Sequence, residues 1–181
     1  MIRELRNVSE SGERWEVPWP QGLESSTWSP ERASLAKTFA GAIRQTVSLM
    51  VLMTQAAADR IGINATDLNC LNILSFSGQL TAGELAKATG LTTASITGVV
   101  DRLEQAGFVR RERDAQDRRR VVVHLDTVRA LGTVAPVFGP MLGAMQQLAD
   151  EYTDDELQLI VQFYAQLQDI LRNHLARLRE S

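Results

Sequence analysis

The segment from Leu80 to Leu125 reads LTAGELAKATGLTTASITGVVDRLEQAGFVRRERDAQDRRRVVVHL and decides the fold that we expect. Its start, Thr81-Ala82-Gly83-Glu84, has the pattern of a capping box, which marks the N-terminus of a helix. The pattern predicts a helix that ends at Gly90. Apolar residues at helical spacing then predict a second helix from about Thr92 to Gln105, and Gly107 follows where a glycine commonly ends a helix. The segment therefore predicts two helices joined by a tight turn.

Two short runs rich in β-branched residues follow these helices. Phe108 to Arg111 and Val121 to Leu125 flank a polar stretch, which predicts a β-hairpin. Six arginines and three acidic residues between Phe108 and Arg120 give this part a net charge of +3, although the whole 181-residue chain carries −3. Positive charge concentrated on one loop of an acidic protein favours contact with DNA through a small surface, and disfavours non-specific coating of nucleic acid.

The residues before this segment predict two helices and an arm. Ser29-Pro30-Glu31 combines an N-cap serine, a proline at the first helical position and an acid in the first turn, and helical spacing of apolar residues continues to about Arg60. Asn64 opens the next helix, which closes near Gly78. Residues 1–28 contain three tryptophans, and the prolines among them disfavour a regular helix. This arm either is a flexible extension or docks on the body or on a second subunit.

The residues after the hairpin predict further helices. Helical character runs from about Thr127 to Tyr152, with a bend expected near Pro136 and Pro140, and a second capping box at Thr153 opens the last helix. Apolar residues of the last helix form one stripe, which is typical of a helix that packs along another long helix. We expect this stripe, together with Leu35 of the first long helix, to make the contact of a homodimer; the stripe consists of Leu157, Ile160, Tyr164, Leu167, Leu171, Leu175 and Leu178.

The predicted fold is mainly α-helical with a small β-hairpin wing. We expect a winged helix-turn-helix lobe for DNA binding at residues 63–126. Residues 29–62 and 127–181 are expected to form a helical dimerisation lobe, and residues 1–28 are expected to precede it as the N-terminal arm.

Several classes of protein are disfavoured by the composition. Cys70 is the only cysteine, so no intrachain disulfide is possible. No apolar run approaches the roughly 20 residues that span a bilayer, and the chain starts without an apolar signal segment, so we expect a cytoplasmic protein without a membrane partner. Neither Gly-x-Ser-x-Gly nor Gly-x-x-x-x-Gly-Lys occurs, and His124 and His174 lie far apart without a ligand cluster. We therefore expect no enzyme, no metal site and no cofactor.

The helix pair has the features of a helix-turn-helix. Ala86 supplies the small residue where two such helices cross, and Gly90 supplies the turn. This spacing alone is also compatible with a plain helical hairpin. One face of the second helix carries short hydroxyl side chains and a glycine, which permit close approach to bases and phosphates; these residues are Thr92, Thr93, Ser95, Thr97 and Gly98.

The arginines of the hairpin tip favour the same interpretation. Arginine suits a narrow and strongly negative minor groove, and a nearby carboxylate can hold its guanidinium in place. Arg119 and Asp117 lie two residues apart and can form such a pair. An isolated run of charges is usually only a solvated loop, but one that directly follows a recognition-type helix is better explained as a wing.

Three motifs resemble a known family. Glu84-Leu85-Ala86, the stretch 97–111, and Asp117-Arg118-Arg119-Arg120 followed by Val123-His124-Leu125 resemble the winged helix-turn-helix of MarR-type transcriptional regulators. The resemblance is dense from about residue 64 to 125. It implies a homodimer whose terminal helices form the dimer lobe and whose two winged lobes each read half of a pseudo-palindromic operator. It also implies a sequence-specific regulator of transcription, a repressor that responds to a ligand.

The resemblance also implies roles for individual residues. It places Ser95, Thr97 and Gly98 on the groove-facing side of the recognition helix, with Thr92 and Thr93 near phosphate at its N-terminus. In the wing, it places Arg119 in the minor groove, where Asp117 steadies it. Arg102, Arg113, Arg118 and Arg120 complete the predicted DNA-binding set. One departure concerns Leu125-Asp126-Thr127-Val128-Arg129, where the family usually has Leu-Thr, a small loop and a glycine, which leaves the start of the next helix open.

Members of the family commonly respond to small aromatic or phenolic ligands held between the two lobes. The residues expected to line such a crevice are Phe39, Ile43, Val47, Asn69, Cys70 and Ile73. Most of them are apolar, and an ordinary core explains them better. Redox sensing by Cys70 is a rival input, although a cysteine among leucines usually behaves as a small buried apolar residue. The alternative function is a winged-helix module that binds protein and has no sequence-specific contact with DNA.

Overall fold

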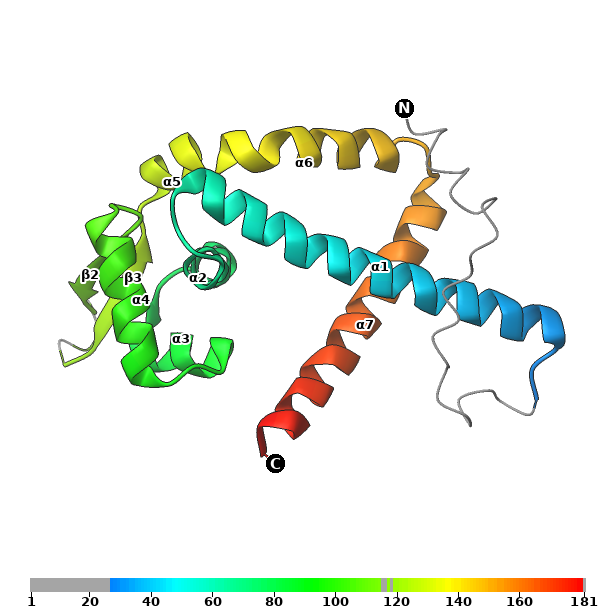
Figure 1. Ribbon diagram of the computed structural model, residues 1–181, viewed down its shortest axis with the longest axis horizontal. Coiled ribbons are helices and arrows are strands. Elements are labelled where there is room, and N and C mark those ends of the chain that lie inside the picture. Colours follow the sequence, from blue (N-terminus) through cyan, green and yellow to red (C-terminus); the bar gives the residue numbers. More distant parts are fainter. Residues whose placement is uncertain (1–26, 115–116, 118, 181) are drawn as a thin grey trace. The chain divides into compact units, whose positions relative to one another are not determined.

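The computed structural model describes residues 27–114, 117 and 119–180, so residues 1–26 of the predicted arm, including Trp15 and Trp19, lie outside the described residues. The chain divides into two compact units, residues 1–49 and 50–181, and the boundary falls within the first helix. The division into the lobes predicted above stays a prediction. The elements drawn in Figure 1 are α1 (Pro30–Ile61), α2 (Ala65–Ser77), β1 (Leu80–Thr81), α3 (Ala82–Thr89), α4 (Thr93–Gln105), β2 (Val109–Arg113), β3 (Val121–Leu125), α5 (Thr127–Thr133), α6 (Ala135–Ala149) and α7 (Asp154–Glu180).

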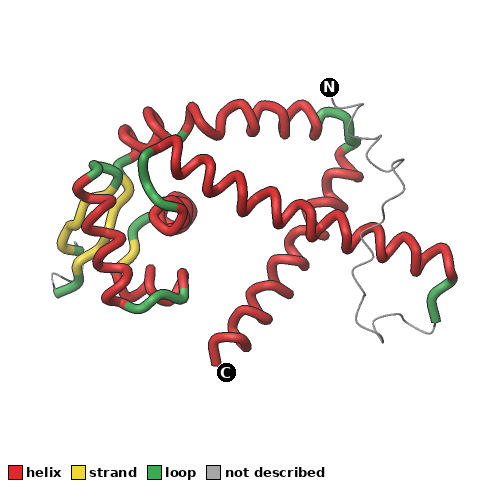
Figure 2. Tube along the Cα trace, viewed as in Figure 1, coloured by secondary structure: helices red, strands yellow, loops and turns green. Residues whose placement is uncertain are grey.

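The mainly helical fold with a small β-sheet is confirmed, and the strands form one group among the helices (Figure 2). The sheet has three antiparallel strands in the order β1-β3-β2. The sequence predicted only the hairpin of β2 and β3, in which Val109 pairs with Leu125 and Arg113 with Val121. It missed β1, which pairs Leu80 with Val123, because a two-residue strand has no periodicity that a sequence can display.

Local signals position the helix pair as expected. The hydroxyl of Thr81 accepts a hydrogen bond from the Glu84 backbone N–H at 3.2 Å, and the Glu84 carboxylate accepts one from the Thr81 backbone N–H at 2.7 Å. This is the predicted capping box, and α3 starts directly after it. Gly90 ends α3 with a φ of 76° and a ψ of 13°, a left-handed conformation that favours glycine. The turn between α3 and α4 therefore depends on the positive φ of Gly90.

The core of residues 50–181 lies beneath α4. Helices α2, α3 and α4 pack against one another, and α4 also packs on β2. Four residues of α4 at helical spacing enter this core, and all are buried: Ile96, Val99, Val100 and Leu103. Val109 and Val123 close it from the sheet, together with Phe108, which directly precedes β2. Because one face of α4 is fixed in the core, its opposite face is presented to solvent.

The helical stretch after the hairpin is interrupted where a proline was expected to bend it. Helices α5 and α6 meet at Val134 and are inclined by 69°. Pro136 has no N–H to donate to the carbonyl four residues earlier, so the hydrogen bond that would join α5 to α6 at this point is missing. Pro140, in contrast, lies inside α6 without ending it. The start of α5 is also settled, because the Asp126 carboxylate accepts a hydrogen bond from the Arg129 backbone N–H at 2.8 Å and caps the helix.

Among the described residues, no single helix is both long and apolar enough to cross a membrane, and only the bent pair of α5 and α6 together meets that measure.

Candidate nucleic-acid interface

The polar face of α4 is open to solvent. Thr93, Ser95 and Thr97 are exposed, and Gly98 is half-buried. In the described part of the chain, no other helix therefore covers this face. A helix with one face anchored in a core and the other free is the form that enters a major groove.

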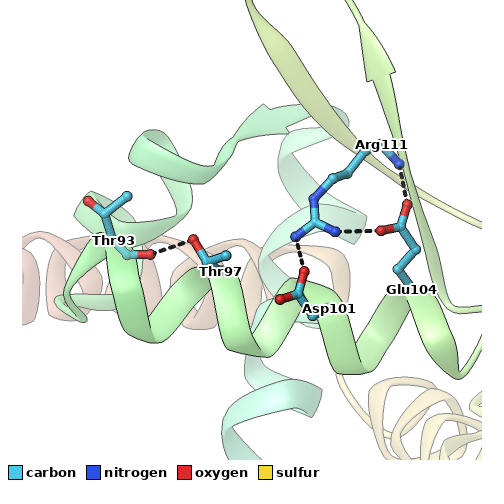
Figure 3. Close-up of polar contacts among 5 residues, drawn as sticks. All are labelled: Thr93, Thr97, Asp101, Glu104 and Arg111. Atoms are coloured by element: carbon cyan, nitrogen blue, oxygen red, sulfur yellow. Dashed lines mark hydrogen bonds and ion pairs between the residues drawn. The ribbon is translucent and has the colours of Figure 1, made fainter.

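The hydroxyl groups on this face are largely bonded within the helix itself. The hydroxyls of Thr92 and Ser95 lie 2.9 Å apart, and the Thr92 hydroxyl also accepts from the Ser95 backbone N–H at 3.1 Å, which caps α4. The hydroxyl of Thr97 donates to the backbone carbonyl of Thr93 at 2.9 Å (Figure 3). For the Thr93 hydroxyl, no partner is found among the described residues. Thr93 thus retains a free hydrogen-bonding group on this face.

Nothing in the described part of the chain requires a glycine at residue 98. Its backbone does not have a positive φ, unlike that of Gly90 or Gly107. A Cβ placed on it would meet the Arg102 Nη1 atom at 3.7 Å, which is ordinary van der Waals contact. A glycine inside a helix costs roughly 0.5–1 kcal/mol relative to alanine, so its benefit is expected to lie in what approaches this face.

Arg102 is held by a carboxylate from another helix. Its Nε donates to Asp67 Oδ2 at 3.1 Å and its Nη2 to Asp67 Oδ1 at 2.6 Å, a bidentate pair between α4 and α2. Asp67 is only 2% exposed, whereas the Arg102 side chain is 52% exposed. The hydrogen bonds that Arg102 donates to Asp67 raise the pKa of Arg102 above its ordinary value. The sequence predicted Arg102 as a DNA contact, but the structure gives it a partner inside the protein.

Cys70 lies one turn after Asp67 on α2 and is completely buried. Burial raises the pKa of its thiol to about 11, the negative charge of Asp67 adds to this effect, and Arg102 opposes it. A thiol of this kind is protonated near neutral pH, and the thiolate is the reactive form. The setting agrees with the expectation that Cys70 acts as a small apolar core residue.

The wing is tied to α4 by Arg111. Its Nη2 lies 2.6 Å from Asp101 Oδ1, its Nη1 pairs with the Glu104 carboxylate, and its backbone N–H donates to Glu104 at 3.1 Å (Figure 3). Asp101 and Glu104 both project from α4 toward β2 in that view. These contacts fix where the sheet lies relative to the recognition helix, and sequence reasoning assigned no role to any of the three residues.

Two further arginines of the wing are also paired. The Arg110 Nε lies 2.5 Å from a Glu112 carboxylate oxygen, within β2. The Arg120 Nη2 lies 2.9 Å from a carboxylate oxygen of Glu84 in α3. By contrast, the guanidinium groups of Arg113 and Arg119 have no ion-pair partner in the part of the chain that the structure describes. Arg118 lies outside that part.

Asp117 supports the wing tip in a different way from the one expected. Its carboxylate accepts from the Arg119 backbone N–H at 3.0 Å, and its carbonyl accepts from the Arg120 backbone N–H at 2.9 Å. The predicted pairing of Asp117 with the Arg119 guanidinium is therefore replaced by a bond to the Arg119 backbone. The turn is fixed, while the Arg119 side chain is exposed and pairs with none of the described acids.

The residues predicted for a ligand crevice are divided between the two compact units. Phe39, Ile43 and Val47 belong to the first unit and lie on α1, whereas the other three belong to the second unit and lie on α2. Asn69 is exposed and Ile73 is half-buried. Cys70 lies wholly inside the core, so it does not line an open surface. The crevice stays a prediction.

Metal-binding clusters are absent from residues 27–114, 117 and 119–180, since no group of three or more His, Cys, Asp and Glu side chains there is placed to hold an ion.

Comparisons with known proteins agree with this geometry. The MarR family model matches residues 63–121, from the start of α2 to the first residue of β3. The HTH-type transcriptional regulator YcgE of Bacillus subtilis is 42% identical over 149 residues, which cover 82% of this chain and 96% of YcgE. The HTH-type transcriptional repressor YetL of the same organism is 28% identical over 89 residues, covering 49% of this chain and 53% of YetL.

A solved structure shares the fold. It is that of a mutant of MepR from Staphylococcus aureus bound to an oligodeoxyribonucleotide, with a TM-score of 0.50, 23% identity, and coverage of 75% of this chain and 96% of MepR. The extent and identity of the match to YcgE, together with the family model, establish the family. The chain belongs to the MarR family of DNA-binding transcriptional regulators, and it is not an enzyme.

Proposed function

We propose that this regulator is a homodimeric repressor that binds a pseudo-palindromic operator in double-stranded DNA through α4 and the wing. The observation that carries the proposal is the exposed polar face of α4 next to wing arginines that lack a partner in the described chain. The relative YetL is named a repressor, and the MepR mutant was solved on DNA, which supports this direction. A repressor acts where the chromosome lies, so we expect it in the cytoplasm.

The wing arginines divide into two groups with different expected roles. Arg110, Arg111 and Arg120 already pair with carboxylates, so a contact with DNA would first require those pairs to break. Arg113 and Arg119 carry charge that the described residues do not neutralise. We therefore assign the minor-groove contact to Arg119 and a phosphate contact to Arg113. Arg102, which pairs with the buried Asp67, is assigned to holding α4 in place.

A second copy of the chain is the proposed cover for the apolar stripe of α7. Leu157, Ile160 and Leu167 are half-buried, whereas Tyr164, Leu171 and Leu178 are exposed by 51%, 56% and 63%. A 27-residue helix with so continuous an apolar face is seldom left in water. In a symmetric dimer, the two recognition helices can enter successive major grooves about 34 Å apart.

The response to a small aromatic or phenolic effector is the remaining part of the proposal. An effector that prefers one spacing of the two recognition helices shifts the population away from the DNA-binding spacing. Phe39 and Val47 are exposed on α1 and are among the apolar groups that such a ligand would contact.

The test is binding of the full chain to a duplex from its own upstream region, measured by fluorescence anisotropy at several salt concentrations. Arg119→Ala is expected to weaken specific binding by about 1–3 kcal/mol and to reduce the salt slope by about 1. Arg110→Ala is the matched control, because it removes the same charge from the wing but from an arginine that is already paired. Equal affinities for Arg119→Ala and the wild type would remove Arg119 from the interface.

The same experiment separates the alternative function. Binding by the wild type that ignores the DNA sequence, or no binding, would favour a winged-helix module whose partner is a protein.

A further inference from the structure

The Thr97 hydroxyl donates a hydrogen bond within its own helix. The Oγ1–H donates to the Thr93 carbonyl one turn earlier at 2.9 Å (Figure 3). A threonine in a helix divides between two rotamers because this bond to a preceding carbonyl is available. To donate to a base, Thr97 would have to break the bond and rotate. While this bond is made, the hydroxyl can only accept a hydrogen bond, so this exposed side chain offers a partner an acceptor oxygen and a methyl group.

The neighbours of Thr97 leave this methyl group accessible. Thr93 and Asp101 lie one turn before and one turn after it on the same side of α4 (Figure 3). Asp101 is engaged by Arg111 at 2.6 Å. Gly98 next to it carries no side chain, and a Cβ there would meet nothing closer than 3.7 Å. The surface around Thr97 thus allows a close approach.

We propose that Thr97 is a specificity-determining residue that recognises a thymine through its methyl group and not through its hydroxyl. In the major groove, the C5-methyl of thymine is an apolar feature that the other bases lack, and a threonine methyl group is one of its known apolar partners. The inference rests on the proposed binding of α4 in the major groove, and it names the chemistry of one contact there.

The test begins with duplexes that the full-length wild-type protein selects from a random-sequence pool. Each thymine is then replaced in turn by deoxyuridine, which removes only the C5-methyl group. For wild type, one position in each half-site is expected to lose affinity by about fourfold, the value for burying one methyl-sized group, and replacement in both half-sites by about fifteenfold.

Two variants then separate the methyl group from the hydroxyl. Thr97→Val keeps the shape and the methyl group but removes the hydroxyl, so it should bind within about twofold of wild type and keep the sensitivity to deoxyuridine. Thr97→Ser keeps the hydroxyl but removes the methyl group. It should therefore bind the thymine duplex as weakly as wild type binds the duplex with deoxyuridine in both half-sites. Replacing the thymines by deoxyuridine should not weaken the binding of Thr97→Ser any further. Circular dichroism melting shows whether both variants are folded.

The opposite pattern, in which Thr97→Ser resembles wild type and Thr97→Val loses affinity, would assign the contact to the hydroxyl and overturn the inference. A wild type that selects a sequence but is insensitive to deoxyuridine at every position also overturns it, while leaving the proposed DNA binding intact. A wild type that selects no sequence overturns both.

Discussion

Removal of the Arg102 side chain tests whether this arginine holds the fold or contacts DNA. In Arg102→Ala, the Asp67 carboxylate keeps its buried position but loses both hydrogen bonds from the guanidinium. Breaking a fully buried pair by removing one partner costs about 3–5 kcal/mol. The Arg102 side chain is 52% exposed, so water can reach the vacated space and the cost falls. We expect a loss of about 1–3 kcal/mol in the free energy of unfolding, the range for a buried group left without its partner.

The measurement is urea denaturation at a fixed protein concentration, because a dimer's stability depends on concentration. Arg172→Ala is the matched control. Arg172 pairs with Asp169 at 3.3 Å, but both side chains are largely exposed, so the loss should stay below about 1 kcal/mol. The single variant Asp67→Ala and the double variant with both substitutions complete a double-mutant cycle. The double variant should be more stable than Arg102→Ala, since it leaves no buried charge without a partner.

DNA binding provides the decisive contrast. If Arg102 only positions α4, the salt slope of binding should be unchanged in the folded Arg102→Ala variant. A variant that is as stable as wild type but has a salt slope reduced by about 1 would refute the structural role. That result would restore the role in DNA binding that the sequence alone predicted for Arg102.

Two other predictions concern α4 and α7. Gly98→Ala should raise the free energy of unfolding by about 0.5–1 kcal/mol, because the new Cβ is not crowded, and urea denaturation measures this gain. The same variant should weaken specific DNA binding, measured by anisotropy, if α4 approaches the bases closely. Unchanged affinity would show that DNA does not approach at Gly98. Replacing Leu167 and Leu171 together with glutamate should yield monomers that bind DNA poorly, as judged by sedimentation velocity, while Gln168→Glu next to them should stay dimeric; a dimer in the double variant would mean that the subunit contact lies elsewhere.

The sequence by itself determined the parts of this protein that depend on neighbouring residues. The capping boxes at Thr81 and Thr153, the left-handed glycine at Gly90 and the apolar spacing of α4 are all short-range features. Hydrogen bonds between residues three or four apart, and the period of a helix, form in the same way wherever the segment lies in a fold. For this reason the helix pair, the hairpin and the exposed face of α4 were predicted correctly.

Only the tertiary structure decided which charged side chains form ion pairs within the protein. In the sequence, all the arginines of the wing and of α4 look alike. The structure pairs Arg102 with an aspartate 35 residues away, Arg120 with a glutamate 36 residues away, and Arg111 with two acids of α4. It also adds β1 to the hairpin. An ion pair or a strand pair between distant residues depends on where the backbone brings them together, and no local pattern of residues records that position.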